Sequence, residues 1–306
     1  MKRDLVSIGE LRREEILTIF SLTEELKEKR RKGEMTHLLP GYILAMIFEK
    51  PSLRTRVTFE TGIEDLGGHG IYLAPSDIQL GKRESVADVA RNLSRWVHLI
   101  MARTFSHQTI INLAQNATVP VINGLSDEEH PCQVLGDLLT MREHHPGFPE
   151  VKIAWIGDGN NVCHSLILGC SIMDCELKIA TPPGYEPKEE YLMKAEGLGK
   201  RPLVTNQPDL AVSGVDFIYT DVWTSMGQEE EAEKRREIFR PFQINDALLK
   251  HAKKTCKVMH CLPAHRGEEI TNEILDGPAS IVLDQAENRL HIQKGIMVWL
   301  TRPSGP

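Results

Sequence analysis

Residues 52–56 combine side chains that suit an anion. This stretch reads Ser-Leu-Arg-Thr-Arg, follows an apolar run at 42–48, and precedes Val57, Phe59 and Ile63, which fit one face of a helix. A helix N-terminus offers unpaired backbone N–H groups and a partial positive charge, and hydroxyl and guanidinium groups add donors that match a phosphate. A capped surface helix with two solvated arginines explains the same pattern equally well.

A second polar group, His130-Pro131-Cys132-Gln133, opens another predicted helix. Proline suits the first helical turn, and His and Gln can hydrogen-bond a carbonyl oxygen that gains charge in a transition state. Taken alone, the motif favours nothing more than a polar helix start.

The stretch IGDGNNVCHS at 156–165 imitates a dinucleotide fingerprint. Val162 stands where the third glycine belongs, and the next predicted strand ends at 181–182 in Thr-Pro, without an acidic residue to hold a ribose. A dinucleotide site is therefore disfavoured. Asn160 and Asn161 remain as polar groups at a strand end, where a helix cap and a ligand site are about equally expected.

Two further strand ends carry reactive groups. Asp221 precedes the irregular 225–227 (Ser-Met-Gly), Cys261 precedes Leu262, and Arg289 lies on the last predicted helix. An Asp at a strand end is more often a cap, and a Cys after an apolar strand is more often an inert core thiol. Taken together, the motifs indicate an anion on one wall of a cleft and an amine-bearing molecule on the other.

Apolar runs alternate with helix-length segments along most of the chain, which predicts βαβ units and parallel sheets. Helix breakers at 146–149 place a domain boundary between residues 148 and 149. A final helix at 285–301 is expected to pack back on the first domain, and the charged run at 228–237 is expected to form one solvated helix. The predicted strands are 43–48, 70–73, 98–102, 119–122, 152–156, 177–180, 216–219, 257–260 and 280–283.

Composition narrows the class of protein. The 306 residues are 41% hydrophobic and carry a net charge of −7, which favours a folded core and disfavours a nucleic-acid-binding protein. The N-terminus lacks a signal-peptide pattern, no apolar run approaches the length of a membrane span, and the six cysteines lack paired spacing. We therefore expect a cytoplasmic protein with reduced thiols and no metal site.

The complete set of motifs resembles the ornithine carbamoyltransferase family, within the aspartate/ornithine carbamoyltransferase superfamily. The resemblance covers essentially the whole chain and rests on S-x-R-T-R, H-P-C-Q, D-x-x-x-S-M-G and H-C-L-P in the family's order. It implies an α/β protein with two Rossmann-like domains and an active site in the cleft between them. The implied domains are 1–148, which would bind carbamoyl phosphate, 149–285, which would bind L-ornithine, and a C-terminal helix at 286–306.

The resemblance also implies roles for individual residues. The expected catalytic residues are Arg54, Arg103, His130, Asp221 and Cys261. The expected carbamoyl phosphate ligands are Ser52, Leu53, Arg54, Thr55, Gln79, Arg103, His130, Pro131, Cys132, Gln133 and Arg289, with Gln79 reaching a neighbouring subunit of a homotrimer. The expected ornithine ligands are Asn161, Asp221, Ser225, Met226, Cys261 and Leu262. Citrulline and phosphate would be the products, in arginine biosynthesis or breakdown, with no cofactor.

One residue departs from the family's pattern, because Leu53 stands where a threonine is usual. A hydroxyl donor is lost there, although the backbone N–H remains. Rival interpretations are a carbamoyltransferase for aspartate, a diamine or an acylated ornithine, a non-catalytic relative, and a nicotinamide-dependent dehydrogenase. The Ser-Met-Gly motif disfavours aspartate and a diamine as acceptors, and an acylated ornithine stays open. The intact motif residues disfavour a non-catalytic relative, and the incomplete glycine motif disfavours a dehydrogenase.

Overall fold

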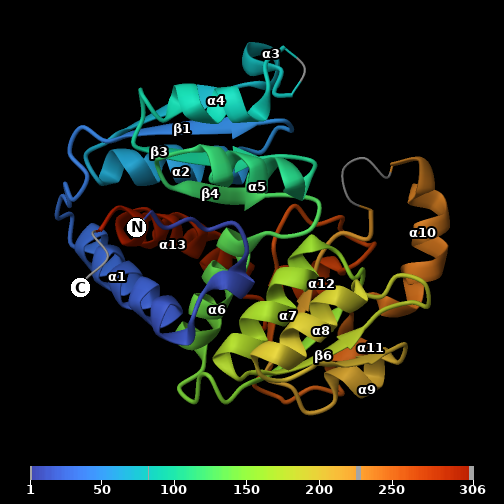
Figure 1. The fold of residues 1–306 in the computed structure, drawn as a ribbon. Helices are drawn as coiled ribbons and strands as arrows, with labels where there is room; N and C mark the ends of the chain where they lie inside the picture. The colour runs from blue at the N-terminus through green and yellow to red at the C-terminus, as the bar shows by residue number, and fades with distance from the viewer. Residues whose placement is uncertain (1, 82, 225–228, 303–306) are drawn as a thin grey trace. The chain divides into compact units, whose positions relative to one another are not determined.

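The computed structural model describes residues 2–81, 83–224 and 229–302. The chain forms two compact units, Met1–Gly136 with Glu287–Pro306, and Asp137–Ala286. Two helices, α6 (Pro131–His144) and α13 (Val282–Thr301), contribute residues to both units (Figure 1). The domain boundaries deduced from the sequence stay a prediction.

The first unit is built on a parallel sheet of four strands among the described residues, in the order β2-β1-β3-β4. Its strands are β1 (Ile43–Phe48), β2 (His69–Leu73), β3 (Leu99–Arg103) and β4 (Val121–Leu125). Its helices are η1 (Ile8–Glu10), α1 (Arg13–Arg31), α2 (Leu53–Asp65), α3 (Pro75–Ile78), α4 (Val86–Leu93) and α5 (His107–Asn116).

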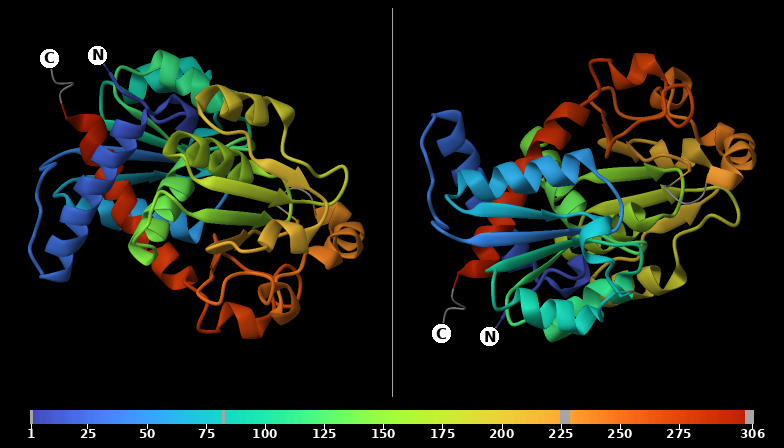
Figure 2. Two further views of the ribbon diagram at one scale, coloured as in Figure 1. Left: turned by 90° about the horizontal axis from the view of Figure 1, so that it is seen from below. Right: turned by 90° about the horizontal axis from the view of Figure 1, so that it is seen from above.

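Both faces of this sheet are covered by helices (Figure 2). Ala45 and Ile100 belong to a core that α4 and α5 complete on one face. On the other face, glycines allow α1, α2 and α13 to pack closely against one another. Gly62 of α2 lies against Met297 of α13, and Gly295 of α13 lies against α1. Burial on both faces is what a parallel sheet requires, and it explains the unbroken apolar run of β1.

The second unit holds a parallel sheet of five strands among the described residues, in the order β7-β6-β5-β8-β9. Its strands are β5 (Lys152–Ile156), β6 (Glu176–Ala180), β7 (Leu203–Thr205), β8 (Phe217–Thr220) and β9 (Lys257–His260). Its helices are α7 (Asn161–Met173), α8 (Glu189–Leu198), α9 (Pro208–Val212), η2 (Glu229–Glu231), α10 (Ala232–Phe239), η3 (Arg240–Phe242), α11 (Asp246–Leu249) and α12 (Asn272–Leu275).

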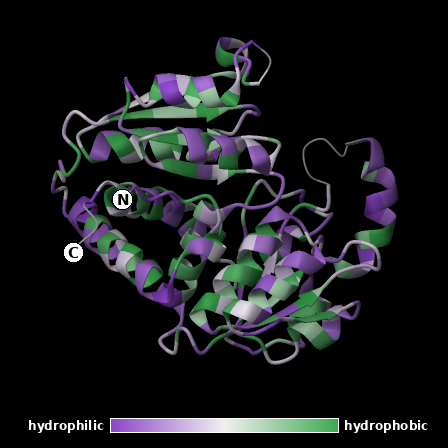
Figure 3. Ribbon diagram, viewed as in Figure 1, coloured by the Kyte–Doolittle hydropathy of each residue, from purple (hydrophilic) through white to green (hydrophobic). Residues whose placement is uncertain are grey.

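One apolar cluster on a face of this second sheet joins the strands to α9, α11 and α12. Figure 3 shows the strands of the first sheet as largely hydrophobic, whereas α10 is mostly hydrophilic. The two-sheet α/β architecture predicted from the sequence is confirmed. Among the described residues, no helix is both long and apolar enough to cross a membrane.

Two strand assignments from the sequence were wrong. The apolar run at 280–283 was expected to be a strand, but only Ser280 forms a single bridge, to Val258, and α13 begins at Val282. Short apolar runs do not distinguish a buried strand from a helix start by periodicity. Strand β7 was missed, because it has three residues and its Leu203 is 51% exposed.

The charged run at 228–237 was expected to be one solvated helix. Residue 228 lies outside the described residues, and the described part divides into η2 and α10. Arg235 is buried, with 3% of its surface exposed, so the expectation of a fully solvated helix was wrong. A buried guanidinium needs a charged or polar partner, and this partner lies beside the candidate site.

Candidate active site

The first group of predicted site residues lies at the topological switch point of the four-stranded sheet. In the order β2-β1-β3-β4, the chain leaves β1 and β3 in opposite directions across the sheet. Ligands of open α/β sheets bind at such a point, beyond the carboxyl ends of the strands. Ser52 follows β1 and caps α2, because its hydroxyl accepts the Thr55 N–H at 3.3 Å, and Arg103 ends β3.

Thr55 joins the segments of this group, although they are distant in sequence. Its Oγ1 accepts hydrogen bonds from Arg103 Nη1 at 3.4 Å and from Arg289 Nη2 at 3.3 Å. Arg289 also donates from Nη1 to Gln133 Oε1, and all four residues are at least 93% buried. A hydroxyl that accepts two hydrogen bonds still has its hydrogen to donate. The group can therefore present a hydroxyl and two guanidinium groups to one ligand.

His130 lies among these cations and is 4% exposed. Burial lowers the pKa of its imidazole well below the ordinary value, and Arg289, Arg103, Lys50 and Arg54 lower it further. The ring is therefore neutral at neutral pH, with one nitrogen as a donor and the other as an acceptor. Four cations around one neutral imidazole create a local positive potential in a chain of net charge −7, which suits a multiply charged anion.

Three further predicted residues, Pro131, Cys132 and Leu53, have no hydrogen bond to Thr55 or Arg289 among those described above. They differ from one another in burial. Pro131 begins α6, and Cys132 is fully buried, donating from Sγ to the carbonyl of Asn123 at 3.4 Å. Burial raises the pKa of the Cys132 thiol to about 12, which makes this group inert as a nucleophile. Leu53 is 73% exposed, so its side chain is not held in the core, and its backbone lies in the first turn of α2.

Gln79 lies apart from this group, and Lys50 belongs to it although it was not predicted. Gln79 is exposed to solvent, and its backbone is in the left-handed region, with φ 44°. It has no hydrogen bond to the other site residues that the structure describes. Lys50 is 9% exposed, with its Nζ 4.8 Å from the centroid of the Phe105 ring. Burial lowers the pKa of Lys50, and Arg103 lowers it further.

The second group lies at the switch point of the five-stranded sheet, between β5 and β8. Asp221, 8% exposed, follows β8, and its carboxylate accepts three hydrogen bonds. Oδ2 accepts from Asn160 Nδ2 at 2.8 Å, while Oδ1 accepts from the Val222 N–H at 2.8 Å and from Cys261 Sγ at 2.9 Å. The contact between Asp221 and Cys261 joins two motifs that are 40 residues apart.

The residues after Cys261 are held in an unusual backbone conformation. Leu262 has φ 57°, a region that leucine rarely adopts, and its N–H donates to His260 Nδ1 at 2.8 Å. The other nitrogen of that ring, Nε2, contacts Glu269 Oε1 at 3.0 Å. Because Nδ1 accepts, Nε2 must carry the hydrogen, and the imidazole is fixed by both partners. Strain of this kind persists only where its surroundings hold it.

Asn160 and Asn161 have separate positions. Asn160 caps α7, since its side chain accepts from the N–H groups of Val162 and Cys163 while its amide reaches Asp221. It is thus both a cap and a site residue, and the sequence-based ligand set did not include it. Asn161 is the first residue of α7 and is half-buried. Ser225 and Met226, also predicted ornithine ligands, lie outside the described residues.

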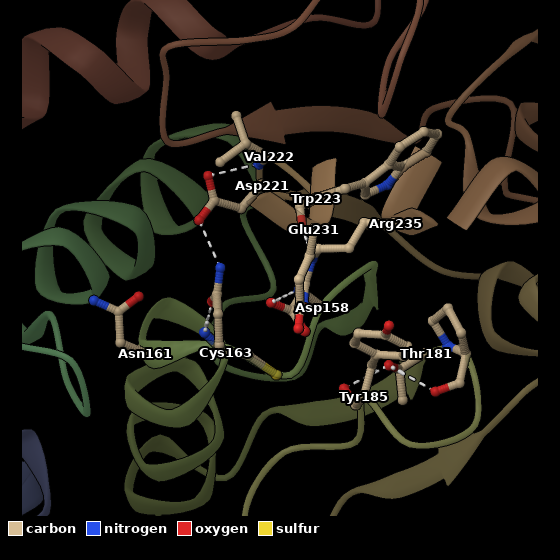
Figure 4. Close-up of polar contacts among 12 residues, drawn as sticks. Asp158, Asn161, Cys163, Thr181, Tyr185, Asp221, Val222, Trp223, Glu231 and Arg235 are labelled. Carbon is tan, nitrogen blue, oxygen red and sulfur yellow. Dashed lines mark hydrogen bonds and ion pairs between the residues drawn. The ribbon is translucent and has the colours of Figure 1, made fainter. Parts of the chain in front are cut away.

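The buried arginine of the charged run supports this second group (Figure 4). Arg235 donates from Nη2 to Asp158 Oδ2 at 2.5 Å and from Nε to the carbonyl of Trp223 at 2.5 Å. Its guanidinium also lies 4.7 Å from the centroid of the Tyr185 ring. Asp158 follows β5 and Trp223 follows β8, so this one side chain ties together the two loops that carry Asn160 and Asp221.

We expect Asp158 to make stability depend on pH. Burial raises its pKa from 3.8 to about 6, although Arg235 acts in the opposite direction. Because the folded chain holds this proton more tightly, Asp158 stabilises the fold most below pH ~4, and this contribution is lost as pH rises through about 6. A shift of this size corresponds to about 3 kcal/mol.

The measurement is urea unfolding of the wild type and Asp158→Asn at pH 4 and pH 7. The wild type should lose about 2.4 kcal/mol relative to the variant between these pH values, because part of the full effect is already lost at pH 4. If the free energies of unfolding of the wild type and the variant differed by the same amount at both pH values, Asp158 would have an ordinary pKa despite its burial.

The geometry of the two groups indicates the class of protein. A cluster of cations with a neutral imidazole suits an anionic donor, and a carboxylate with a thiol and an amide suits an amine. The two groups are therefore those of a candidate transferase that acts on an anionic donor and an amine.

Comparison with known proteins agrees with this class. Residues 3–143 match the model of the family described as aspartate/ornithine carbamoyltransferase, carbamoyl-P binding domain. Residues 149–300 match the companion Asp/Orn binding domain. An ornithine carbamoyltransferase of Methanosarcina mazei is 53% identical over 302 residues, covering 99% of this chain and 100% of that protein.

Solved structures of ornithine carbamoyltransferases are also similar to this chain. An ornithine carbamoyltransferase from Pyrococcus furiosus superposes with a TM-score of 0.93 at 50% identity, covering 97% of this chain and 96% of the other. An anabolic ornithine carbamoyltransferase from Campylobacter jejuni has a TM-score of 0.93 at 36% identity, covering 98% and 99%. The chain belongs to the aspartate/ornithine carbamoyltransferase family.

Proposed function

We propose that this enzyme transfers the carbamoyl group of carbamoyl phosphate to the side-chain amine of L-ornithine, giving L-citrulline and phosphate. The observation that carries the proposal is the pair of groups at the two switch points. Arg103 and Arg289 converge on Thr55 in one group, and Cys261 and Asn160 converge on Asp221 in the other. The names of the relatives support the same substrates.

The cationic group would bind the phosphate end of the donor. Ser52, Leu53, Arg54 and Thr55 offer backbone N–H groups and side chains in the first turn of α2, where a phosphate is favoured. Arg103 adds a buried guanidinium from β3. When the bond between the carbamoyl carbon and the phosphate oxygen breaks, negative charge increases on phosphate, and these cations stabilise it.

The carbamoyl oxygen would be held by neutral donors. It gains charge as the carbon becomes tetrahedral, and fixed hydrogen-bond donors aimed at that charge are usually the largest catalytic term. The Thr55 hydroxyl has a hydrogen to donate, and the neutral His130 ring has one N–H. Gln133 is oriented by Arg289, which bonds its Oε1 and so directs the amide NH₂ elsewhere.

The second group would bind ornithine. The carboxylate of Asp221 suits the α-ammonium group, and Asn161, Leu262, Ser225 and Met226 are the further proposed ligands. The side-chain amine must lose a proton before it attacks, because an alkyl ammonium titrates near 10.4. We propose that Cys261, hydrogen-bonded to Asp221, positions this amine after its first proton has passed to solvent. A second proton is released from the nitrogen as the C–N bond forms, and we propose that it leaves with the phosphate as the C–O bond breaks.

Asp221 also discriminates between acceptors. Aspartate would bring a second carboxylate beside a buried one, and like charges in a desolvated site repel strongly. A diamine lacks the amino-acid head group, so it would leave part of the polar group without a partner, which costs affinity. Ornithine is therefore favoured over both.

A citrulline assay tests the proposal directly. Carbamoyl phosphate is supplied with ornithine, putrescine or aspartate, and the carbamoylated product is measured. Ornithine should exceed either rival in kcat/KM by at least about 100-fold, because unpaired buried polar groups penalise the wrong acceptor by several kcal/mol. A preference for putrescine or aspartate would overturn the assignment of the acceptor.

We also propose that three copies assemble, with Gln79 of one reaching the carbamoyl phosphate of the next. The exposed apolar side chains of the first unit include Leu53 (73%), Val57 (50%) and Ile71 (39%). Ile71 lies on β2, an edge strand of its sheet, and an exposed apolar edge favours association. A second copy of the chain is the occupant that we propose.

Sedimentation equilibrium should therefore give three times 34.5 kDa, or a multiple of it. Val57→Glu should dissociate the assembly, whereas Leu203→Glu, an equally exposed site in the second unit, should leave it intact. An active monomer would remove Gln79 from the site. Separately, we propose that the enzyme is located in the cytoplasm.

A further inference from the structure

The loop between β9 and α12 carries a group of potential metal ligands that the proposed reaction does not use. His265, Glu268 and Glu269 each offer one ligand atom, and these atoms lie within 4.8 Å of one another. Two ligands held about 2.1 Å from an ion can be at most about 4.2 Å apart. The three side chains therefore need to approach by less than ~1 Å to share one ion.

The group differs from a cluster of surface carboxylates because one of its members, Glu269, is buried. The residue is fully buried, and its Oε1 already accepts from His260 Nε2 at 3.0 Å and from the His265 N–H at 2.6 Å. Its Oε2 is buried and has no hydrogen-bond partner among the residues that the structure describes. A buried carboxylate oxygen without a partner is energetically unfavourable, and a bound cation would satisfy it.

The two other side chains give access from solvent. The His265 side chain is 47% exposed, and its Nδ1 lies 3.8 Å from Glu268 Oε2. Glu268 uses its other oxygen for Arg236 Nε at 2.9 Å. Two carboxylates with one arginine leave a net charge of about −1, which attracts a divalent ion. One imidazole nitrogen and two carboxylate oxygens suit a first-row transition ion better than calcium or magnesium, which prefer oxygen alone.

A neighbouring group, Asp221 with His260 and Cys261, also has the residue types of a metal site. Its imidazole is not available, because Nδ1 accepts from the Leu262 N–H and Nε2 donates to Glu269. The His260–Glu269 hydrogen bond links the two groups. The thiol of Cys261 belongs to only one of these two groups of described residues, so a sulfur signal tells them apart.

We propose that His265, Glu268 and Glu269 bind a divalent first-row transition ion, with water completing its coordination. This site lies outside the proposed reaction and does not depend on it. The ion would neutralise the buried Glu269 carboxylate and hold the loop that follows β9. It departs from the expectation of a protein without a metal site.

Cobalt(II) is the probe, because its absorption distinguishes nitrogen and oxygen ligands from sulfur. Calorimetry of the full-length enzyme should show one Co²⁺ per chain, with weak visible bands and no sulfur charge-transfer band. His265→Ala and Glu268→Gln should each weaken binding at least tenfold, the lower bound for loss of even an outer-shell partner. Both side chains are partly exposed, so the fold should survive these changes.

The control is His251→Ala, because His251 forms a similar exposed pair with Asp209 at 3.9 Å but belongs to no third-ligand group among the described residues. Its Co²⁺ affinity should equal that of the wild type. Glu269→Gln, which keeps the shape of the side chain, should abolish binding while thermal unfolding checks that it folds. Absence of binding, affinity unchanged in the His265 and Glu268 variants, or a sulfur band lost in Cys261→Ser would overturn the proposal.

Discussion

Asp221→Asn should lower kcat/KM for ornithine by roughly 30-fold to several thousand-fold. Removing one partner of a desolvated, hydrogen-bonded charge pair costs about 2–5 kcal/mol, and each 1.4 kcal/mol is tenfold. The substitution also places an amide near Cys261 Sγ and Asn160 Nδ2, both of which donate to the wild-type carboxylate. Loss of the charge and loss of one of the two acceptor oxygens act in the same direction.

Carbamoyl phosphate provides the internal control for this variant. Its proposed ligands belong to the other unit, so its affinity for the free enzyme, measured by calorimetry, should change less than about twofold. Asp209→Asn, an exposed carboxylate on α9, should alter neither substrate. If carbamoyl phosphate binding collapsed in Asp221→Asn while ornithine kinetics were spared, the assignment of substrates to the two groups would be wrong.

The sequence predicted the parts of the molecule that depend on local pattern. Parallel strands buried on both faces appear as unbroken apolar runs, so β1, β5 and β9 were predicted with their observed bounds. The Ser52 cap was equally visible, because capping needs only a hydroxyl three residues before the accepted N–H. Patterns of this kind require no knowledge of distant contacts.

Other features depend on contacts that no local pattern contains. Arg289 reaches Thr55 across 234 residues, and only the family resemblance brought it into the predicted site. Arg235 was assigned to a solvated face because its neighbours are charged, yet Asp158 and the Trp223 carbonyl hold it in the interior. Lys50 stood within the first motif, but its burial beside Phe105 follows from the packing of β3 against β1.

Arg54→Ala should lower kcat/KM for carbamoyl phosphate by about 100- to 1000-fold, the usual effect of removing one preorganised donor from a developing negative charge. Arg54 lies in the first turn of α2 and is near enough to His130 to lower the pKa of that ring. Its loss should reduce kcat more than it raises KM, because charge on the phosphate increases as the bond to the carbamoyl carbon breaks.

The remaining cations decide how complete this loss is. Arg103 and Arg289 stay hydrogen-bonded to Thr55 in the variant, so the phosphate retains some of its partners and binding should persist at reduced affinity. Arg91→Ala, which removes an exposed arginine from α4 of the same unit, should leave the kinetics unchanged. Because both arginines lie on helices and neither is fully buried, unfolding should not distinguish the two variants. Wild-type kinetics in Arg54→Ala would therefore show that the anion binds elsewhere than at the start of α2.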